Sequence, residues 1–308
     1  MLIYCVCFVL LSCVCGRAQS SDWFQYTVSN GLPDVNITST TEASDGALWF
    51  CSVNGVGRFD GATWQHFTTD NGISDNWVRS SFEDSDGRIW LSTGNGVSVY
   101  DGNTWERFTK EDGIIGEVAA KYGITESADG SIWVATNGGI SRYDGNGWQR
   151  FTEDDELTSN EIRSLALTAD KKSIWFASAG GVSHYDGFSW QHFSELEDVR
   201  SIAVAADGTI WASTANMGIH SYDGTSWNRA SPAEVRYNGV NNIYAAENGD
   251  LWFASPVGVD RYDGNTWQSF STPERAVGIV EGWDGSIWCI TLHNILRFDR
   301  SEEHTSEL

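Results

Sequence analysis

Residues 86–105 read DGRIWLSTGNGVSVYDGNTW, and near-copies of this stretch recur along the chain. A tryptophan that follows Ile or Leu recurs about every 40 residues, at Trp49, Trp90, Trp133, Trp175, Trp211, Trp252 and Trp288. A second tryptophan, shortly after an Asp-Gly pair, stands at Trp64, Trp105, Trp148, Trp190, Trp227 and Trp267. Self-similarity with this period indicates an architecture built from repeated small supersecondary units.

One unit contains four short β-prone runs separated by turn signals. In the unit quoted above, the runs are Val78–Glu83, Arg88–Thr93, Val97–Tyr100 and Thr104–Thr109. The pairs between them are Asp86-Gly87, Asn95-Gly96 and Asp101-Gly102. Such pairs favour type I′ hairpin turns, because both central residues of that turn need a positive φ. The pattern predicts a four-stranded antiparallel meander, and no run reaches the length expected of a helix.

The second run of each unit is apolar at consecutive positions, as in Ile89-Trp90-Leu91. Both faces of such a strand must be buried, so each meander needs a neighbour on either side. Radial stacking of four-stranded blades provides this cover and leaves only short edges. The chain is therefore predicted to be all-β, and specifically a β-propeller.

The two ends of the repeat region complement each other. Trp23–Thr27 resembles the fourth run of a unit, with no earlier runs before it. The last unit ends after its third run, Ile295–Asp299. We therefore expect one domain over residues 22–299, a seven-bladed β-propeller closed by the N-terminal strand.

The terminal segments fall outside the repeat. Residues 1–18 are expected to be a secretory signal peptide, because Leu2 to Val14 is apolar and uncharged and small residues precede Gln19. An alternative is a lipoprotein signal with an acylated Cys13. Both place the protein in the periplasm or at the cell surface. Residues 300–308, RSEEHTSEL, resemble a translated sequencing adapter, so we expect a non-native tail on a truncated chain.

Charge and cysteine content narrow the class of protein. The net charge of −23 argues against a general surface for nucleic acid or anionic membranes. Only Cys51 and Cys289 of the six cysteines follow the signal segment, on corresponding runs of the first and last units. A disulfide between them is one alternative, and two buried thiols are the favoured one.

The sequence contains no recognisable catalytic or metal-binding constellation. Asp84-Ser85-Asp86-Gly87 resembles the start of a calcium loop but lacks the later bidentate Glu, so we assign it to a turn. The histidines have no metal-ligand spacing, and no nucleophile motif occurs. We therefore expect no metal and no cofactor. His293 differs from the other histidines because it occupies a loop between the second and third strands.

The residues that the repeat does not explain point to one rim of the ring. Two of the 16 tryptophans, Trp77 and Trp283, lie outside the repeat pattern, and Trp77 directly precedes a first strand. A corresponding position on the first strands is polar in six units of seven, and its residues are Thr38, Arg79, Tyr122, Arg163, Arg200, Asn241 and Val277. Trp77, Arg79, Tyr122, Arg163, Arg200, Asn241 and His293 are therefore the candidate ligand-binding residues.

Two alternatives are open for this set. Three arginines at the channel mouth can form a cationic collar that recognises carboxylate or sulfate groups. Alternatively, each arginine pairs with an acid such as Asp34, Asp75 or Glu161 and only ties the blades together.

The repeat resembles the two-component regulator propeller family. The resemblance is carried by Gly72-Ile73-Ser74-Asp75-Asn76-Trp77-Val78, by Glu83 to Asp101 and by Asp129 to Gly145. It implies the periplasmic sensor half of a hybrid sensor kinase, followed by a membrane helix and a kinase. No kinase or phospho-acceptor motif is found in this sequence.

The resemblance implies that the chain senses a small molecule or glycan on the loop rim. A protein-binding scaffold is a second hypothesis. A third is an enzyme, since streptogramin lyases and lactonases are similar in architecture. Those enzymes need converging histidine and acid or metal groups on the rim, where this chain offers only His293.

Overall fold

The computed structural model describes residues 5–6, 25–26, 28–34, 36–116, 123–155, 157–230, 239–272, 274–281, 285, 287–291 and 295–298. These residues form β-strands joined by turns, with three short 3-10 helices: η1 (Val28–Asn30), η2 (Thr69–Asn71) and η3 (Glu153–Asp155). No helix in the described ranges is long and apolar enough to cross a membrane.

Six four-stranded antiparallel sheets follow one another along the chain, and we call each a blade. Blade 1 contains β3 (Ile37–Glu42), β4 (Leu48–Ser52), β5 (Gly55–Phe59) and β6 (Trp64–Phe67). Blade 2 contains β7 (Val78–Glu83), β8 (Ile89–Thr93), β9 (Gly96–Tyr100) and β10 (Trp105–Phe108). Blade 3 contains β11 (Ile124–Glu126), β12 (Ile132–Thr136), β13 (Gly139–Tyr143) and β14 (Trp148–Phe151).

The second half of the chain continues the series. Blade 4 contains β15 (Ile162–Leu167), β16 (Ile174–Ser178), β17 (Gly181–Tyr185) and β18 (Trp190–Phe193). Blade 5 contains β19 (Val199–Val204), β20 (Ile210–Thr214), β21 (Ile219–Tyr222) and β22 (Trp227–Arg229). Blade 6 contains β23 (Asn242–Ala245), β24 (Leu251–Ser255), β25 (Gly258–Tyr262) and β26 (Trp267–Ser271). A three-stranded sheet follows, with β27 (Ala276–Glu281), β28 (Ile287–Thr291) and β29 (Ile295–Phe298).

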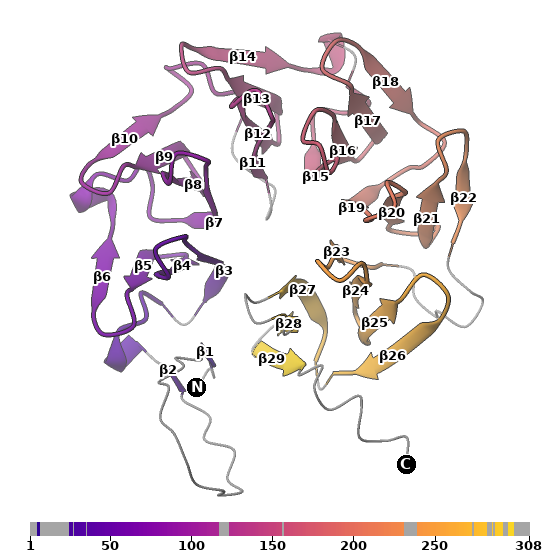
Figure 1. Cartoon of the computed structure of the whole chain (residues 1–308). Coiled ribbons are helices and arrows are strands. Elements are labelled where there is room, and N and C mark those ends of the chain that lie inside the picture. Colours follow the sequence, from indigo (N-terminus) through magenta and orange to yellow (C-terminus); the bar gives the residue numbers. More distant parts are fainter. Residues whose placement is uncertain are drawn as a thin grey trace, which may run out of the picture.

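The sheets are arranged around a common centre (Figure 1). The first strand of each sheet is innermost, and the fourth strand of each four-stranded blade is outermost. The predicted strands of the second unit agree with β7, β8, β9 and β10 to within one residue at each end. The prediction of an all-β chain of four-stranded antiparallel meanders is therefore confirmed.

The hairpin turns differ from the predicted type. The glycines of the Asp-Gly pairs have a positive φ, for example 78° at Gly87 and 96° at Gly102. Lys171 and Asp198 are the only residues other than glycine with a positive φ in the described ranges, so the aspartates of these pairs have a negative φ. A type I′ turn needs two successive positive values, so that prediction is wrong. The turn is shaped instead by the aspartate side chain, since Asp101 accepts from the backbone N–H groups of Asn103 and Thr104.

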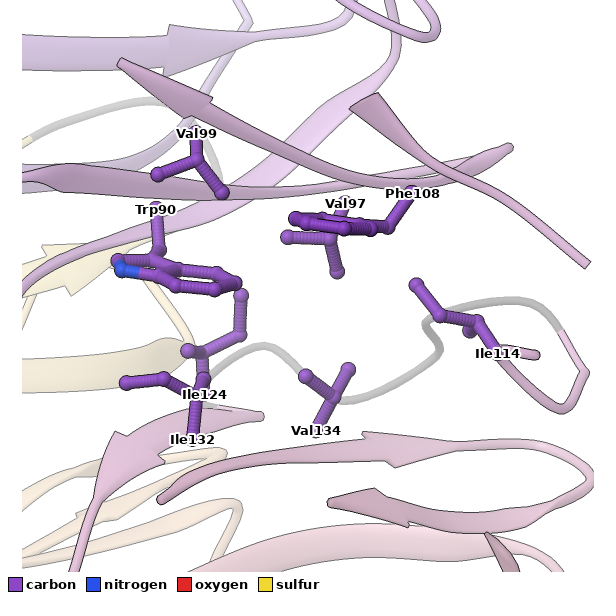
Figure 2. Packing of buried hydrophobic residues seen from close by; sticks show 8 residues of the cluster. All are labelled: Trp90, Val97, Val99, Phe108, Ile114, Ile124, Ile132 and Val134. Carbon is purple, nitrogen blue, oxygen red and sulfur yellow. The ribbon is translucent and has the colours of Figure 1, made fainter. Parts of the chain in front are cut away.

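The core lies between neighbouring blades. Figure 2 shows Trp90 and Phe108 of blade 2 packed against Ile124, Ile132 and Val134 of blade 3. Trp90 is 1% exposed, and its ring stacks on Phe108 with 6.2 Å between centroids. Replacing a buried aromatic side chain of this kind by Ala costs about 3–5 kcal/mol, so the tryptophans supply much of the attraction between blades.

Carboxylates at the ends of the innermost strands also connect neighbouring blades. Glu126 of blade 3 accepts from the backbone N–H and the hydroxyl of Ser85 in blade 2, at 2.9 and 2.7 Å. Glu83 of blade 2 makes the same two contacts with Ser44 of blade 1. One side chain thus caps the first turn of the preceding blade, which fixes the relative height of the two sheets.

The predicted closing strand pairs elsewhere in this structure. β2 (Gln25–Tyr26) pairs with β1 (Cys5–Val6), with Cys5 opposite Tyr26. β1 in turn contacts β29, the edge at which the N-terminal strand was expected. The expected pairing of Trp23–Thr27 with Ile295–Asp299 is therefore not observed. Cys5–Val6 therefore lie beside β29, between that edge and β2.

The two cysteines of the repeat region form no disulfide. Cys51 and Cys289 are both buried and not bonded to each other, as the favoured alternative predicted. Burial raises the pKa of the Cys51 thiol to about 12, so this group behaves as a small apolar side chain.

Removal of residues 1–18 should allow the N-terminal strand to complete the last sheet. In a chain that begins at Gln19, we expect slower amide hydrogen exchange at residues 295–298 than in a chain that begins at Val28. Trp23→Ala in the longer chain should then lower the free energy of unfolding by about 3–5 kcal/mol. Equal exchange in the two chains would contradict the closure.

Stability should fall in acid because of the turns between third and fourth strands. Backbone N–H groups of Thr63 and Ala62 lower the pKa of Asp60 to about 2, and those of Thr266 and Asn265 do the same for Asp263. A lowered folded-state pKa adds stability above the unfolded value near 3.8, and this contribution is lost as the pH falls toward 2. Melting temperatures measured between pH 5 and pH 2 should therefore decrease; a flat profile would refute this role.

Candidate functional site

The predicted site residues belong to one recurring position at the start of the innermost strands. We call this the entry position, and it carries Thr38, Arg79, Tyr122, Arg163, Arg200, Asn241 and Val277. The residue two places earlier varies as well, and we call it the flanking position. It carries Asn36, Trp77, Ala120, Glu161, Asp198, Gly239 and Arg275. The residue between them is apolar and fully buried at Val78, Ile162 and Val199, which anchors the backbone of each pair.

Side chains at the entry position reach toward the following blade. The hydroxyl of Thr38 donates to the backbone oxygen of Val78 at 2.6 Å. The amide of Asn241 donates to the backbone oxygen of Ala276 at 3.1 Å and accepts from Nη2 of Arg275 at 2.7 Å. Asn241 is therefore engaged with the next sheet rather than free to bind a ligand.

Arg163 forms a clamp between blades. Its Nε lies 3.1 Å from Oε1 of Glu161, and its Nη1 contacts Oδ1 of Asp198, at the flanking position of blade 5. Burial acts to lower the pKa of Arg163, but the hydrogen bonds that it donates to Asp198 and Glu161 raise this pKa overall. The structure thus supports the pairing alternative for this arginine, with Glu161 as one of the partners considered.

Arg79 has a different environment. Its guanidinium carbon lies 4.1 Å from the ring centroid of Trp77, which is a close cation–π contact. Trp77 is 45% exposed, although its backbone is fixed by hydrogen bonds to Asp75 and Gly94. The Nε of Arg79 is buried without a hydrogen-bond partner, and no carboxylate of the described residues pairs with the guanidinium.

Arg200 also lacks a counter-ion in the described part of the chain. No ion pair or hydrogen bond of its side chain is found there. A β-carbon built on Gly239 of blade 6 would lie 3.6 Å from Nη1 of Arg200. The arginine therefore points at the flanking position of the next blade, as Arg163 does.

Other predicted residues cannot be placed. Tyr122, His293 and Trp283 lie outside the described residues. The described histidines have structural partners: His66 contacts the backbone oxygen of Gly31 at 2.7 Å, and His184 stacks on Trp175 with centroids 4.0 Å apart. Within the described ranges, no group of three or more His, Cys, Asp or Glu residues could hold a metal ion.

Sequence reasoning found the entry position and singled out Trp77 and Glu161, but it did not recognise the flanking position as a recurring one. Asp198 and Gly239 carry no motif of their own. Only their place in the repeat marks these two residues: each precedes an entry residue by two places, and they lie one repeat unit apart. That comparison becomes informative only once the structure shows that each entry side chain meets the flanking residue of the next blade.

A comparison with protein families identifies one repeat directly. The sequence model of the two component regulator propeller family matches residues 72–95, which include Trp77 and Arg79. The chain therefore carries a repeat of the family that it resembles. A search of curated protein sequences found no match.

Solved structures share the fold at low sequence identity. The extracellular domain of a hybrid two-component system from B. thetaiotaomicron is 18% identical, with a TM-score of 0.71 over 89% of this chain and 40% of that one. Virginiamycin B lyase from Staphylococcus aureus, solved with quinupristin, is 16% identical, with a TM-score of 0.64 over 85% of this chain and 94% of that one. PorZ, a surface component of the type-IX secretion system of Porphyromonas gingivalis, is 17% identical, with a TM-score of 0.66 over 91% of this chain and 49% of that one.

These likenesses establish a propeller fold and no more. The chain spans less than half the length of the two-component extracellular domain it matches, so that protein contains further parts. The lyase has nearly the same length as the matched region, which shows that one fold serves both signalling proteins and enzymes.

The clamp at Arg163 predicts an effect on stability. Arg163→Ala should lower the free energy of unfolding by about 0.5–1 kcal/mol, the range of partly exposed ion pairs. Arg200→Ala, which breaks no ion pair in the described chain, should change it by less than about 0.5 kcal/mol. Urea unfolding of the two variants measures both values, and equal losses would show that Arg200 has a comparable partner.

Proposed function

We propose that this chain is an extracytoplasmic ligand-binding propeller, the sensor part of a two-component signalling protein. The ligand, a small molecule or a glycan, binds on the rim that carries the entry and flanking positions. The family match at residues 72–95 and the fold shared with a two-component extracellular domain support this assignment.

The exposed contact between Trp77 and Arg79 carries the proposal. An aromatic ring that is 45% exposed, on a backbone fixed by two hydrogen bonds, offers a rigid apolar face to a sugar ring or another planar group. The guanidinium beside it provides N–H donors for an anionic or hydroxyl group of the same ligand. Neither residue is required by the packing between blades, where the repeated tryptophans already fill the interface.

We infer the number of blades and the closure of the ring as well. Seven blades closed by the N-terminal strand form the domain over residues 22–299, after cleavage of a signal peptide at residues 1–18. The protein then acts in the periplasm or at the cell surface and passes its signal to a membrane-bound kinase part. Nucleic acid is not a partner, because a net charge of −23 repels it.

Binding should depend on the Trp77–Arg79 pair. Calorimetric titration of the full chain with a panel of neutral and acidic oligosaccharides should identify at least one ligand. Trp77→Ala and Arg79→Gln should each lower the affinity for that ligand by about tenfold or more, since each variant loses a contact worth at least about 1.4 kcal/mol.

Arg107→Gln is the matched control, because Arg107 is exposed on the outer strand β10 and should leave the affinity unchanged. Binding that is insensitive to both rim variants would place the ligand elsewhere. Mass spectrometry of the same mixtures would reveal cleavage products, which would favour an enzyme over a sensor.

A further inference from the structure

Two arginines at equivalent positions in adjacent blades differ in the residue that faces them from the next blade. Arg163 and Arg200 both occupy the entry position, and each faces the flanking residue of the next blade. For Arg163 that residue is Asp198, whose carboxylate contacts the guanidinium. For Arg200 it is Gly239, which has no side chain. A carboxylate therefore contacts the arginine at one border between blades, whereas no side chain faces the arginine at the next border.

The backbone of the two flanking residues is similar. Asp198 has a φ of 53° and Gly239 a φ of 99°, so both lie in the left-handed region. Val199 and Val240, which follow them, are 0% and 1% exposed. A β-carbon on Gly239 would lie 3.6 Å from Nη1 of Arg200 and 3.9 Å from Cγ of Pro256, which are ordinary contact distances. The position opposite Arg200 therefore has room for a β-carbon, although a φ of 99° strains any residue other than glycine there.

Exposed apolar side chains lie in the turns between the second and third strands of blades 5 and 6. Val257 follows Pro256 in the turn between β24 and β25, and its side chain is 44% exposed. Met217, in the corresponding turn of blade 5, is 40% exposed. Few large hydrophobic side chains are exposed in the described chain, and two of them lie in these adjacent turns.

We propose that Arg200 binds the carboxylate of a ligand in the place that Asp198 occupies at Arg163. The ligand carries a short aliphatic group beside its carboxylate, which contacts Val257 and Met217. A free branched-chain acid and the C-terminus of a peptide ending in an aliphatic residue share this chemistry. The inference rests on the proposed rim-binding function and names one class of ligand for it.

The negative charge of the protein does not prevent such binding. A net charge of −23 repels anions at long range, but salt screens this repulsion beyond about 8 Å. Within that distance a guanidinium without a counter-ion attracts a carboxylate through charge-assisted hydrogen bonds. The sign of the local charge at Arg200 therefore decides which ligands are accepted.

The test uses three small probes with the full chain. N-acetyl-L-leucine imitates a peptide C-terminus, N-acetyl-L-leucine amide removes its charge, and isovalerate represents a free branched acid. NMR titration should show that the first probe binds and that the amide binds at least tenfold more weakly. Isovalerate binding as tightly as N-acetyl-L-leucine would assign the site to free acids, and weaker isovalerate binding would assign it to peptide ends.

Substitutions in the chain test the role of the missing carboxylate. Arg200→Gln should lower the affinity for N-acetyl-L-leucine at least tenfold. Gly239→Asp supplies an internal carboxylate and should lower this affinity as much. Gly239→Asn introduces the same shape and backbone strain without the charge, and it should lower the affinity much less. Should Gly239→Asp fail to fold, the double variant Glu161→Gln with Asp198→Asn frees Arg163 instead and should create a second binding site.

Unchanged affinity in Arg200→Gln, or equal binding of the acid and the amide, would overturn the inference. The failure of the broader function is separate, because it is read from Trp77→Ala and Arg79→Gln with the oligosaccharide panel. Loss of panel binding in those variants, together with no effect of Arg200→Gln on the leucine probe, would leave the rim function standing and refute only the carboxylate site.

Discussion

The structure depends on the contact between the buried tryptophan of each second strand and the following blade. Trp90 meets Tyr143, Trp133 meets Tyr185 and Trp211 meets Tyr262, with centroids 6.0, 5.4 and 5.4 Å apart. Because the same pair recurs, each blade is rotated from its neighbour in a similar way. The starts of the innermost strands are then brought to equivalent places around one centre (Figure 1).

This framework leaves the rim free to vary. The buried residue between the flanking and entry positions anchors the backbone, so the side chains on either side of it do not contribute to the main core. In one blade they form an ion-pair clamp at Arg163, in another a stacked pair at Trp77 and Arg79, and in a third an arginine opposite a glycine. One scaffold thus holds three kinds of chemistry at equivalent positions.

The sequence was sufficient for the strands because local patterns determine them. Alternating turn signals and apolar runs located β7 to β10 almost to the residue. It was not sufficient for the turn type, because an aspartate side chain such as that of Asp101 replaces the second positive φ. The sequence also could not predict that Arg163 and Arg200 have different surroundings, because the residues that face them, Asp198 and Gly239, belong to the next blade. Contacts between blades join residues far apart in the chain, and a local pattern carries no information about them. The sequence also did not predict that β2 would pair with Cys5–Val6, which lie far from it in the chain.

The pairing of entry and flanking positions has a consequence for how such proteins diversify. The flanking and entry residues of one unit lie two positions apart, but the flanking residue faces the unit before and the entry residue faces the unit after. Exchange of a whole unit between two genes would therefore alter recognition at both of its borders while leaving the tryptophan framework intact. A glycine at the flanking position, as at Gly239, leaves no side chain to contact the arginine of the preceding blade. Recombination of units and point mutation at their borders thus both change selectivity without changing the architecture.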